Sequence, residues 1–554
     1  MKKAITLLLI IIYSFLLFSG CSQTSNHQTT NTSSNYEQMG KSAAETIRLL
    51  YSSKDTLDPY TCVTEQNADL SQLIFDPLLI INNQYEIEYR LAENVIVKNN
   101  ICTIKLIDAK FSDGSDVTAD DVVFSFNKAK KSTTTRHASA LKYASSATKE
   151  DNKTVIINLK RNDPYFANLL TFPILKKGSD ELKDTDNQAL VPIGAGRYVF
   201  NNQTATLSLN LHYYGAVSVI KNIQTVDCPD IESVNQAITA GMVDHYYSDL
   251  SGNTIPKMNG HSVGISQNRI VFLGVNNKNP QLSNSLFRQA ISSAINRQDI
   301  CKTAYYGNAT PALGPVPTIW KPAEGLLSIQ DDANLEISKN NIELAGYSKK
   351  DKNGFYLLKN NSPISFTLLV NSNNNSRLSA ANIISKALAD VGIKIKVNSV
   401  SEAKYFSMLR SGNYDLYLGE IRYEDNMDIQ GLISLNSALE FLPSNNSALD
   451  AENISSKSSS KVSTASSNSS LSSLTSSQTE EILTPGEITL TAVDAYKGFY
   501  NGDYTLQDLI TAFNAELPII PVCFKNGMVI YSDRFGNGIT PSKTELFHGI
   551  QFLK

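Results

Sequence analysis

The sequence lacks the patterns that usually mark catalytic and metal sites. No Gly-x-Ser-x-Gly, His-Glu-x-x-His, P-loop or Gly-x-Gly-x-x-Gly pattern occurs in its 554 residues. The six histidines show no pairing at metal-ligand spacing, and no Cys-x-x-Cys pair exists that would suggest a zinc ribbon or a thioredoxin-like site. These absences favour binding over chemistry, so we expect no enzyme activity, no metal and no cofactor.

An excess of charge of one sign is also missing. The chain has 49 Lys and Arg against 53 Asp and Glu, a net charge of -4, and no long run of basic residues. No global basic field for nucleic acid follows from this balance, and no nucleic-acid partner is expected. The 42% of hydrophobic residues is ordinary for a soluble globular protein, and the length predicts more than one domain or lobe.

Long apolar runs are absent except at the N-terminus. Lys2 and Lys3 precede an almost wholly apolar stretch, residues 4–19, which ends in Leu17-Phe18-Ser19-Gly20-Cys21. Small residues directly before a cysteine resemble the bacterial lipobox, which implies a signal peptide over residues 1–20 and a lipid on the thiol of Cys21. The alternative is an uncleaved membrane anchor, although the run is a little short for a span. Both place the rest of the chain outside the cytoplasm.

Two polar segments have too few apolar residues to bury a core. Residues 21–44 are rich in Ser, Thr, Asn and Gln and are predicted to be a flexible tether. Residues 444–480 are dominated by Ser, and we interpret them as a disordered insertion within a folded region.

Helix and strand signals alternate along the rest of the chain. Thr118, followed by Asp121, predicts a capped helix start. Residues 287–295 and 383–391 carry apolar side chains at helical spacing, and Gly392 marks the end of the second helix. Strand-like runs occur at 154–159, 364–370, 393–397 and 414–418. This succession predicts an α/β architecture.

Several segments, in order, resemble the extracellular solute-binding proteins of family 5, the lipoproteins that serve oligopeptide, dipeptide and nickel ABC importers. The most similar is Phe111–Gly114 followed by Val117–Ser125, which resembles the family's signature "F.DGtplTAeDVvfSf". The others are Thr56–Pro59, Ile74–Leu78, Leu91–Glu93, Pro192–Tyr198, Gly241–Asp244, Phe287–Ala290 with Ala294–Arg297 and Gly307, and Pro518–Phe524.

The resemblance implies a type II, periplasmic-binding-protein-like α/β fold whose two lobes close on ligand about a hinge. Lobe one would be discontinuous, with residues 45–270 and 517–554, and lobe two would span 271–516. Arg288 and Arg297, which belong to one of the matching segments, are expected to form salt bridges on helix surfaces.

The resemblance also implies a place for the ligand. Peptide-binding relatives hold the ligand ammonium with an aspartate shortly after a "GdyDl" strand, which Gly412–Leu416 matches. The tryptophan and proline pattern that usually follows is missing here. Asp428 and Asp425 are the candidate ammonium partners, and Arg422 is the candidate clamp for a carboxylate. Glu420 and Tyr423, in the same segment, complete the set of candidate ligand-binding residues.

The leading hypothesis is therefore a monomeric lipoprotein on the outer face of the cytoplasmic membrane that delivers peptides to an ABC permease. Nickel chelates and oligosaccharides are alternative ligands. A sugar site would use aromatic rings that stack on the ligand. The chain has a single tryptophan, Trp320, but its 25 tyrosines leave such stacking open. A peptide-sensing surface receptor and a cell-wall hydrolase are the alternatives from other classes.

Overall fold

The structure is a computed structural model that describes residues 43–250, 257–327, 332–433 and 490–553. Cys21, the predicted signal peptide, the predicted tether up to residue 42 and the Ser-rich insertion lie outside the described residues. Among the described residues, no helix is both long and apolar enough to cross a bilayer.

Three smaller sheets are built from residues 46–227. One is mixed, because β1 pairs parallel to β10 while the other pairs are antiparallel, and the other two are antiparallel throughout. The mixed sheet has the strand order β1 (Thr46–Tyr51), β10 (Asn222–Asp227), β9 (Thr206–Leu209) and β8 (Tyr198–Asn201). The four-stranded antiparallel sheet has the order β4 (Ala92–Lys98), β5 (Ile101–Leu106), β7 (Thr154–Leu159) and β6 (Ala144–Lys149). The third sheet is the pair of β2 (Leu79–Ile81) and β3 (Ile87–Tyr89).

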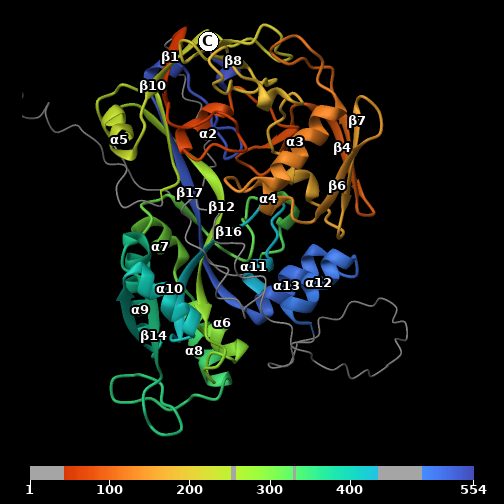
Figure 1. Ribbon diagram of the computed structural model, residues 1–554. Helices are drawn as coiled ribbons and strands as arrows, with labels where there is room; N and C mark the ends of the chain where they lie inside the picture. The colour runs from red at the N-terminus through yellow and green to blue at the C-terminus, as the bar shows by residue number, and fades with distance from the viewer. Residues whose placement is uncertain (1–42, 251–256, 328–331, 434–489, 554) are drawn as a thin grey trace, which may run out of the picture. The chain divides into compact units, whose positions relative to one another are not determined.

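The largest sheet is organised by its two longest strands, β12 (His261–Val275) and β17 (Ile519–Tyr531), which run antiparallel along most of their length (Figure 1). Near one end of this pair β11 pairs with β17, and near the other end β16 pairs with β12. Beyond β16 the sheet continues with β14 and then β15, and both of these pairings are parallel. The remaining strands of the sheet are β11 (His245–Ser248), β16 (Leu416–Arg422), β14 (Ser365–Asn371), β15 (Lys394–Val400) and β13 (Ala309–Pro311), which pairs with β17.

Helices connect and cover these sheets. The predicted cap of α3 is confirmed, because Thr118 and Asp121 exchange hydrogen bonds in a capping box. The helices are α2 (Glu65–Ser71), α3 (Ala119–Lys131), α4 (His137–Ala140), α5 (Ile231–Thr239), α6 (Ser285–Ala294), α7 (Arg297–Thr303), α8 (Leu335–Leu344), α9 (Asn375–Asp390), α10 (Glu402–Ser411), α11 (Gln430–Ile433), α12 (Ala492–Asn501) and α13 (Leu506–Glu516).

The buried side chains form two large cores. One consists only of residues between 271 and 418 together with residues 520–523 of β17, and α6, α7 and α9 pack into it. The other joins residues 47–272 and the C-terminal part of the chain to residues 312–323, 405–433 and 492–513. The chain around α11, α12 and α13 therefore packs against the part of the molecule that contains the N-terminal sheets.

Arg288 and Arg297 do not lie on helix surfaces, as we predicted for their salt bridges. Their side chains are almost fully buried and donate to backbone carbonyls. Arg288 bonds to the carbonyls of Glu516 and Leu517 just before β17, and Nε of Arg297 donates to the carbonyl of Pro521 at 3.0 Å. The two arginines tie α6 and α7 to the start of β17.

Two of the segments with family resemblance, 74–78 and 192–198, contact each other. The backbone of Gly196 donates to the carbonyl of Ile74 at 2.8 Å, and Tyr198 donates to Leu73 at 2.9 Å. A Cβ atom on Gly196 would lie 2.4 Å from the carbonyl carbon of Ile74. Glycine is therefore required here by the close approach of two backbones.

We expect Gly196→Ala to destabilise the protein by about 1–3 kcal/mol, because the added methyl group must displace backbone atoms of Leu73 and Ile74. Gly264→Ala is the matched control, since a Cβ there meets no atom within 4 Å. Urea denaturation measures both effects. Equal unfolding midpoints for the two variants would contradict the importance of this contact.

Candidate functional site

The segment after β16, residues 423–433, carries most of the candidate ligand-binding residues and lies against distant parts of the chain. Its first residue, Tyr423, is buried. It donates its backbone N–H to the carbonyl of Asn268 at 2.7 Å and its hydroxyl to the carbonyl of Pro315 at 2.5 Å. Tyr423 is therefore an anchor of the segment and has no hydroxyl proton left for a ligand in this arrangement.

Three acids of this segment pair with three bases from the predicted lobe one. Glu424 lies 2.6 Å from Arg136, and Asp428 lies 2.7 Å from Arg161. Asp425 pairs with Lys543 and also accepts a bond from Asn268 at 2.8 Å. Because the bases lie far from the segment in the sequence, these pairs hold residues 424–428 against residues 136–161 and 543.

Asp428 is the most enclosed of the three acids, with a side chain 6% exposed. One carboxylate oxygen accepts from Arg161, and the other accepts the hydroxyl of Tyr496 at 2.9 Å and the backbone of Gln430 at 3.0 Å. Arg161 also donates to the Tyr496 hydroxyl at 2.7 Å. Burial raises the pKa of Tyr496, and the charge of Asp428 raises it further. Both oxygens of the candidate ammonium site are thus occupied by groups of the protein.

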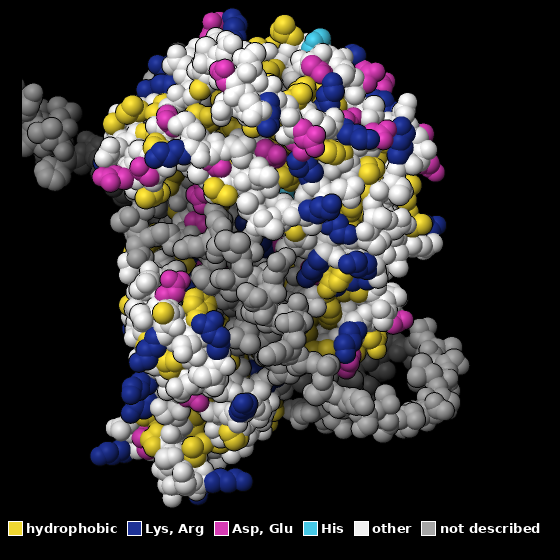
Figure 2. Space-filling view, in the orientation of Figure 1, with side chains coloured by type: hydrophobic (Ala, Val, Ile, Leu, Met, Phe, Trp, Pro, Cys, Tyr) yellow, Lys and Arg dark blue, Asp and Glu magenta, His cyan; other side chains and the backbone are white. Residues whose placement is uncertain are grey.

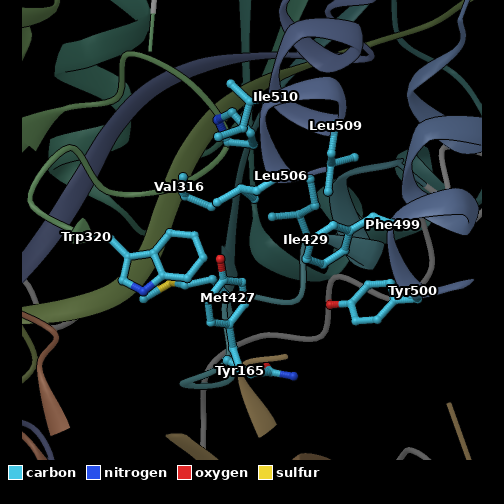
Figure 3. A pocket seen from close by; sticks show the side chains of 12 residues that line it. Tyr165, Val316, Trp320, Met427, Ile429, Phe499, Tyr500, Leu506, Leu509 and Ile510 are labelled. Carbon is cyan, nitrogen blue, oxygen red and sulfur yellow. The ribbon is translucent and has the colours of Figure 1, made fainter. Parts of the chain in front are cut away.

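Tyr500, whose ring centroid lies 3.5 Å from the guanidinium carbon of Arg161, also lines an apolar pocket, which Figure 3 shows from close by. Tyr165 comes from the predicted lobe one, and its ring meets Trp320 edge-on at 4.8 Å and stacks on Phe499 at 6.4 Å. The free space is only about 10 Å³, enough for one water molecule. A ligand side chain therefore needs the surrounding residues to separate. The lining residues are Tyr165, Pro315, Val316, Trp320, Asn426, Met427, Ile429, Phe499, Tyr500, Leu506, Leu509 and Ile510.

Glu420 lies in a buried ion cluster at the centre of the large sheet. Its carboxylate is 2.8 Å from Arg377, 3.4 Å from Lys525 and 3.5 Å from Arg269. Burial alone raises the pKa of Glu420, but the three cations outweigh burial and hold that pKa at about 2. This environment makes Glu420 a structural counter-ion for cations on three elements, rather than a group that faces free space.

Arg422 differs from the other candidates. Within the described part of the chain, its guanidinium makes no side-chain hydrogen bond and no ion pair. Burial lowers its pKa, and the nearby positive charges of Arg136 and Arg269 lower it further, while Tyr247 and Glu424 act in the opposite direction. A partly buried cation of this kind would gain from an anionic partner.

Sequence reasoning missed the groups that surround Asp428. Arg161, Tyr143, Tyr496 and Tyr500 belong to three separate stretches of the chain, and only the i, i+4 spacing of Tyr496 and Tyr500 links any two of them. In the ranges that the structure describes, no group of three His, Cys, Asp or Glu side chains is arranged to hold a metal ion. Side chains of both signs of charge occur over the face in Figure 2.

Comparison with known proteins gives a family match and relatives over most of the chain. The model of bacterial extracellular solute-binding proteins, family 5 Middle, matches residues 86–438. The oligopeptide-binding protein AppA of Bacillus subtilis (strain 168) is 24% identical over 444 residues, which are 75% of this chain and 79% of AppA.

Solved structures share the fold. A nickel ABC transporter protein from Bacillus halodurans matches with a TM-score of 0.65 and 17% identity, over 92% of this chain and 99% of that one. AppA from Bacillus subtilis, in complex with a nonapeptide, matches with a TM-score of 0.50 and 18% identity, over 92% and 99% of the two chains. The prediction of a two-lobed, type II α/β binding fold with a hinge and a discontinuous first lobe is confirmed. The boundaries of the lobes stay a prediction.

We expect Glu420→Gln to cost about 3–5 kcal/mol of stability near neutral pH, because three buried cations lose their shared carboxylate. The low pKa means that this stability is present above the ordinary pKa of Glu and is lost as the pH falls toward about 2. The difference between wild type and variant should therefore shrink in acid. Urea denaturation at neutral and acidic pH measures it.

Glu93→Gln is the control for this experiment, since Glu93 pairs with Lys105 at 2.8 Å with both side chains more than half exposed. Its effect should be small at every pH. A Glu420→Gln variant that unfolds like the Glu93→Gln variant would contradict a stabilising role of the cluster.

Proposed function

Because the chain belongs to the bacterial extracellular solute-binding proteins of family 5, we propose that it is the substrate-binding component of an ABC importer and that its ligand is a peptide. Its partner is then an ABC permease, to which the closed, loaded protein delivers the ligand. The oligopeptide-binding relative AppA supports the ligand class. No chemistry on the ligand is part of this proposal.

The observation that carries the peptide assignment is the pairing of opposite charges along residues 422–428. Asp428 offers an enclosed carboxylate beside an apolar pocket, which suits a terminal ammonium and the side chain next to it. Arg422, on the same segment, has no anionic partner and suits a carboxylate. Asp425 is a weaker candidate, because Lys543 and Asn268 already satisfy it. A zwitterionic ligand of suitable length can use both ends.

Peptides should raise the melting temperature of the purified protein, because a ligand that binds only the native state adds about 2.7 kcal/mol of stability at 100 times its Kd. Mixed di- to octapeptides, nickel–histidine chelates and oligosaccharides are compared in one thermal-shift screen. Asp428→Asn should weaken the binding of peptides with a free amino terminus about ten-fold or more, since a charge-assisted hydrogen bond is lost. N-acetylated peptides should bind both proteins alike.

Asp120 of α3 is exposed and pairs with Lys149 of β6. The control variant Asp120→Asn should therefore leave peptide binding unchanged. A shift only with sugars or nickel chelates would keep the solute-binding function and discard the peptide. Unchanged peptide affinity in Asp428→Asn would remove Asp428 from the site.

We also propose that the protein is a lipoprotein held on the outer face of the membrane through Cys21, as the segment Leu17–Cys21 predicts. Produced in a bacterium as the full chain, the wild type should enter the membrane fraction with an acylated N-terminal cysteine, detected by mass spectrometry. Cys21→Ser should lose the lipid, and Ser22→Ala should keep it. A Cys21→Ser protein that stays in the membrane with residues 1–20 attached would favour the uncleaved anchor.

A peptide-sensing receptor is the second candidate from another class. It would use the same site, so ligand binding does not separate it from an importer. Peptide uptake by cells with and without the protein separates the two: a sensor leaves uptake unchanged.

A further inference from the structure

Arg161 is surrounded by aromatic rings and one carboxylate. Its guanidinium carbon lies 3.6 Å from the ring centroid of Tyr143 and 3.5 Å from that of Tyr500, so the flat cation is sandwiched between two rings. The ring of Tyr496 is 5.8 Å away, and the Asp428 carboxylate lies at the edge of the guanidinium. We call Tyr143, Tyr496, Tyr500 and Asp428 the cation cage. Aromatic faces and a carboxylate together form a strong receptor for a cation.

The cage and its occupant come from different parts of the chain. Asp428 follows β16, and Tyr496 and Tyr500 lie one turn apart on α12. Arg161 lies in the loop after β7. Three of the four cage groups therefore belong to the predicted lobe two, whereas the cation belongs to the predicted lobe one. Opening of the two lobes would withdraw Arg161 and leave most of the cage in place.

Arg161 also fills the cage incompletely. Its Nε is buried and has no hydrogen-bond partner, although its two terminal nitrogens donate to Asp428 and Tyr496. A buried donor without an acceptor reduces the gain from the pairing. Lys142, whose Nζ lies 4.0 Å from Asp428, adds a second positive charge at the edge of the cage. A ligand cation can therefore replace Arg161 without leaving Asp428 unpaired.

We propose that Arg161 is an internal substitute for the ligand: it holds the place beside Asp428 that a cationic group of the ligand would take, so that the ligand must displace it. This inference rests on the proposed function and adds to it a competitor for the site that the chain itself supplies. An apolar neighbour of the ligand's cationic group would enter the pocket beside the cage, because Tyr500 lines both.

The matched comparison is with Arg136, which forms a similar ion pair with Glu424 at 2.6 Å but has a side chain 48% exposed, against 15% for Arg161. In the described part of the structure, no aromatic ring is stacked against the guanidinium of Arg136. Removal of Arg136 therefore weakens the contact between the same two parts of the chain without emptying the cation cage.

The test uses the full-length protein with Arg161→Ala, Arg136→Ala and the double variant Arg161→Ala/Asp428→Asn. Ethylguanidinium chloride at millimolar concentration is the probe, with sodium chloride at equal ionic strength as reference. The melting temperature of Arg161→Ala should rise with ethylguanidinium. The wild type, Arg136→Ala and the double variant should show no such rise, because the cage is filled or has lost its carboxylate.

Peptide affinity gives the second measurement. Trialanine should bind Arg161→Ala about ten-fold or more tightly than wild type, because the competing internal cation is gone. N-acetyl-trialanine should show no gain, and N-acetyl peptides that contain arginine separate a side-chain guanidinium from a terminal ammonium as the preferred cation. Arg161→Lys keeps the charge but loses the ring sandwich, so it should show a smaller gain and serves if the alanine variant fails to fold.

Weaker peptide binding by Arg161→Ala without any response to ethylguanidinium would overturn the inference and make Arg161 a purely structural contact. An equal gain in peptide affinity for Arg136→Ala would overturn it as well, because the effect would then come from looser closure. If no peptide binds any variant, the proposed peptide function fails, whereas the response of Arg161→Ala to ethylguanidinium still decides whether the cage binds cations.

Discussion

The antiparallel pairing of β12 with β17 brings together residues about 250 positions apart, and the candidate site depends on it. The register shifts between Ser266 and Arg269, and again between Val271 and Phe272. Such irregularities redirect side chains. Arg269 thus stands opposite Lys525 on one side and Arg422 on the other, while Val271 stands opposite Glu420. Glu420 neutralises part of this concentration of cations, and Arg422 is left beside it without an anionic partner.

The charges on residues 424–428 connect binding to closure. Each acid is already paired with a base from a distant part of the chain, so a ligand gains only the difference between its own contacts and those it replaces. Exposed pairs such as Arg136–Glu424 contribute little, whereas breaking an enclosed pair such as Arg161–Asp428 leaves a costly buried charge. Exchange of one cation for another at Asp428 avoids that cost.

Local patterns predicted the elements of the fold well, because caps and periodicity act within a few residues. The start of α3 at Thr118, the strand 154–159 and the end of α9 before Gly392 are as predicted. Long-range partners were not predictable in this way. Arg288 looked like a surface residue, since nothing near it in the sequence shows that the carbonyls of residues 516 and 517 enclose it. For the same reason, the sequence did not reveal that Asp428 pairs with Arg161 or that Asp425 pairs with Lys543.

An enclosed carboxylate that binds a ligand cation needs another partner before the ligand arrives. Without one, nothing would compensate Asp428 for the loss of water around its charge, and the enclosed arrangement would be destabilised. Burial alone lowers the pKa of Arg161, but Tyr500, Asp428 and Tyr496 raise it more, so Arg161 stays charged beside the carboxylate. The internal cation thus keeps the carboxylate paired and correctly placed. Arg161 also competes with the ligand, so a ligand cation must bind the cage more strongly than Arg161 does in order to enter.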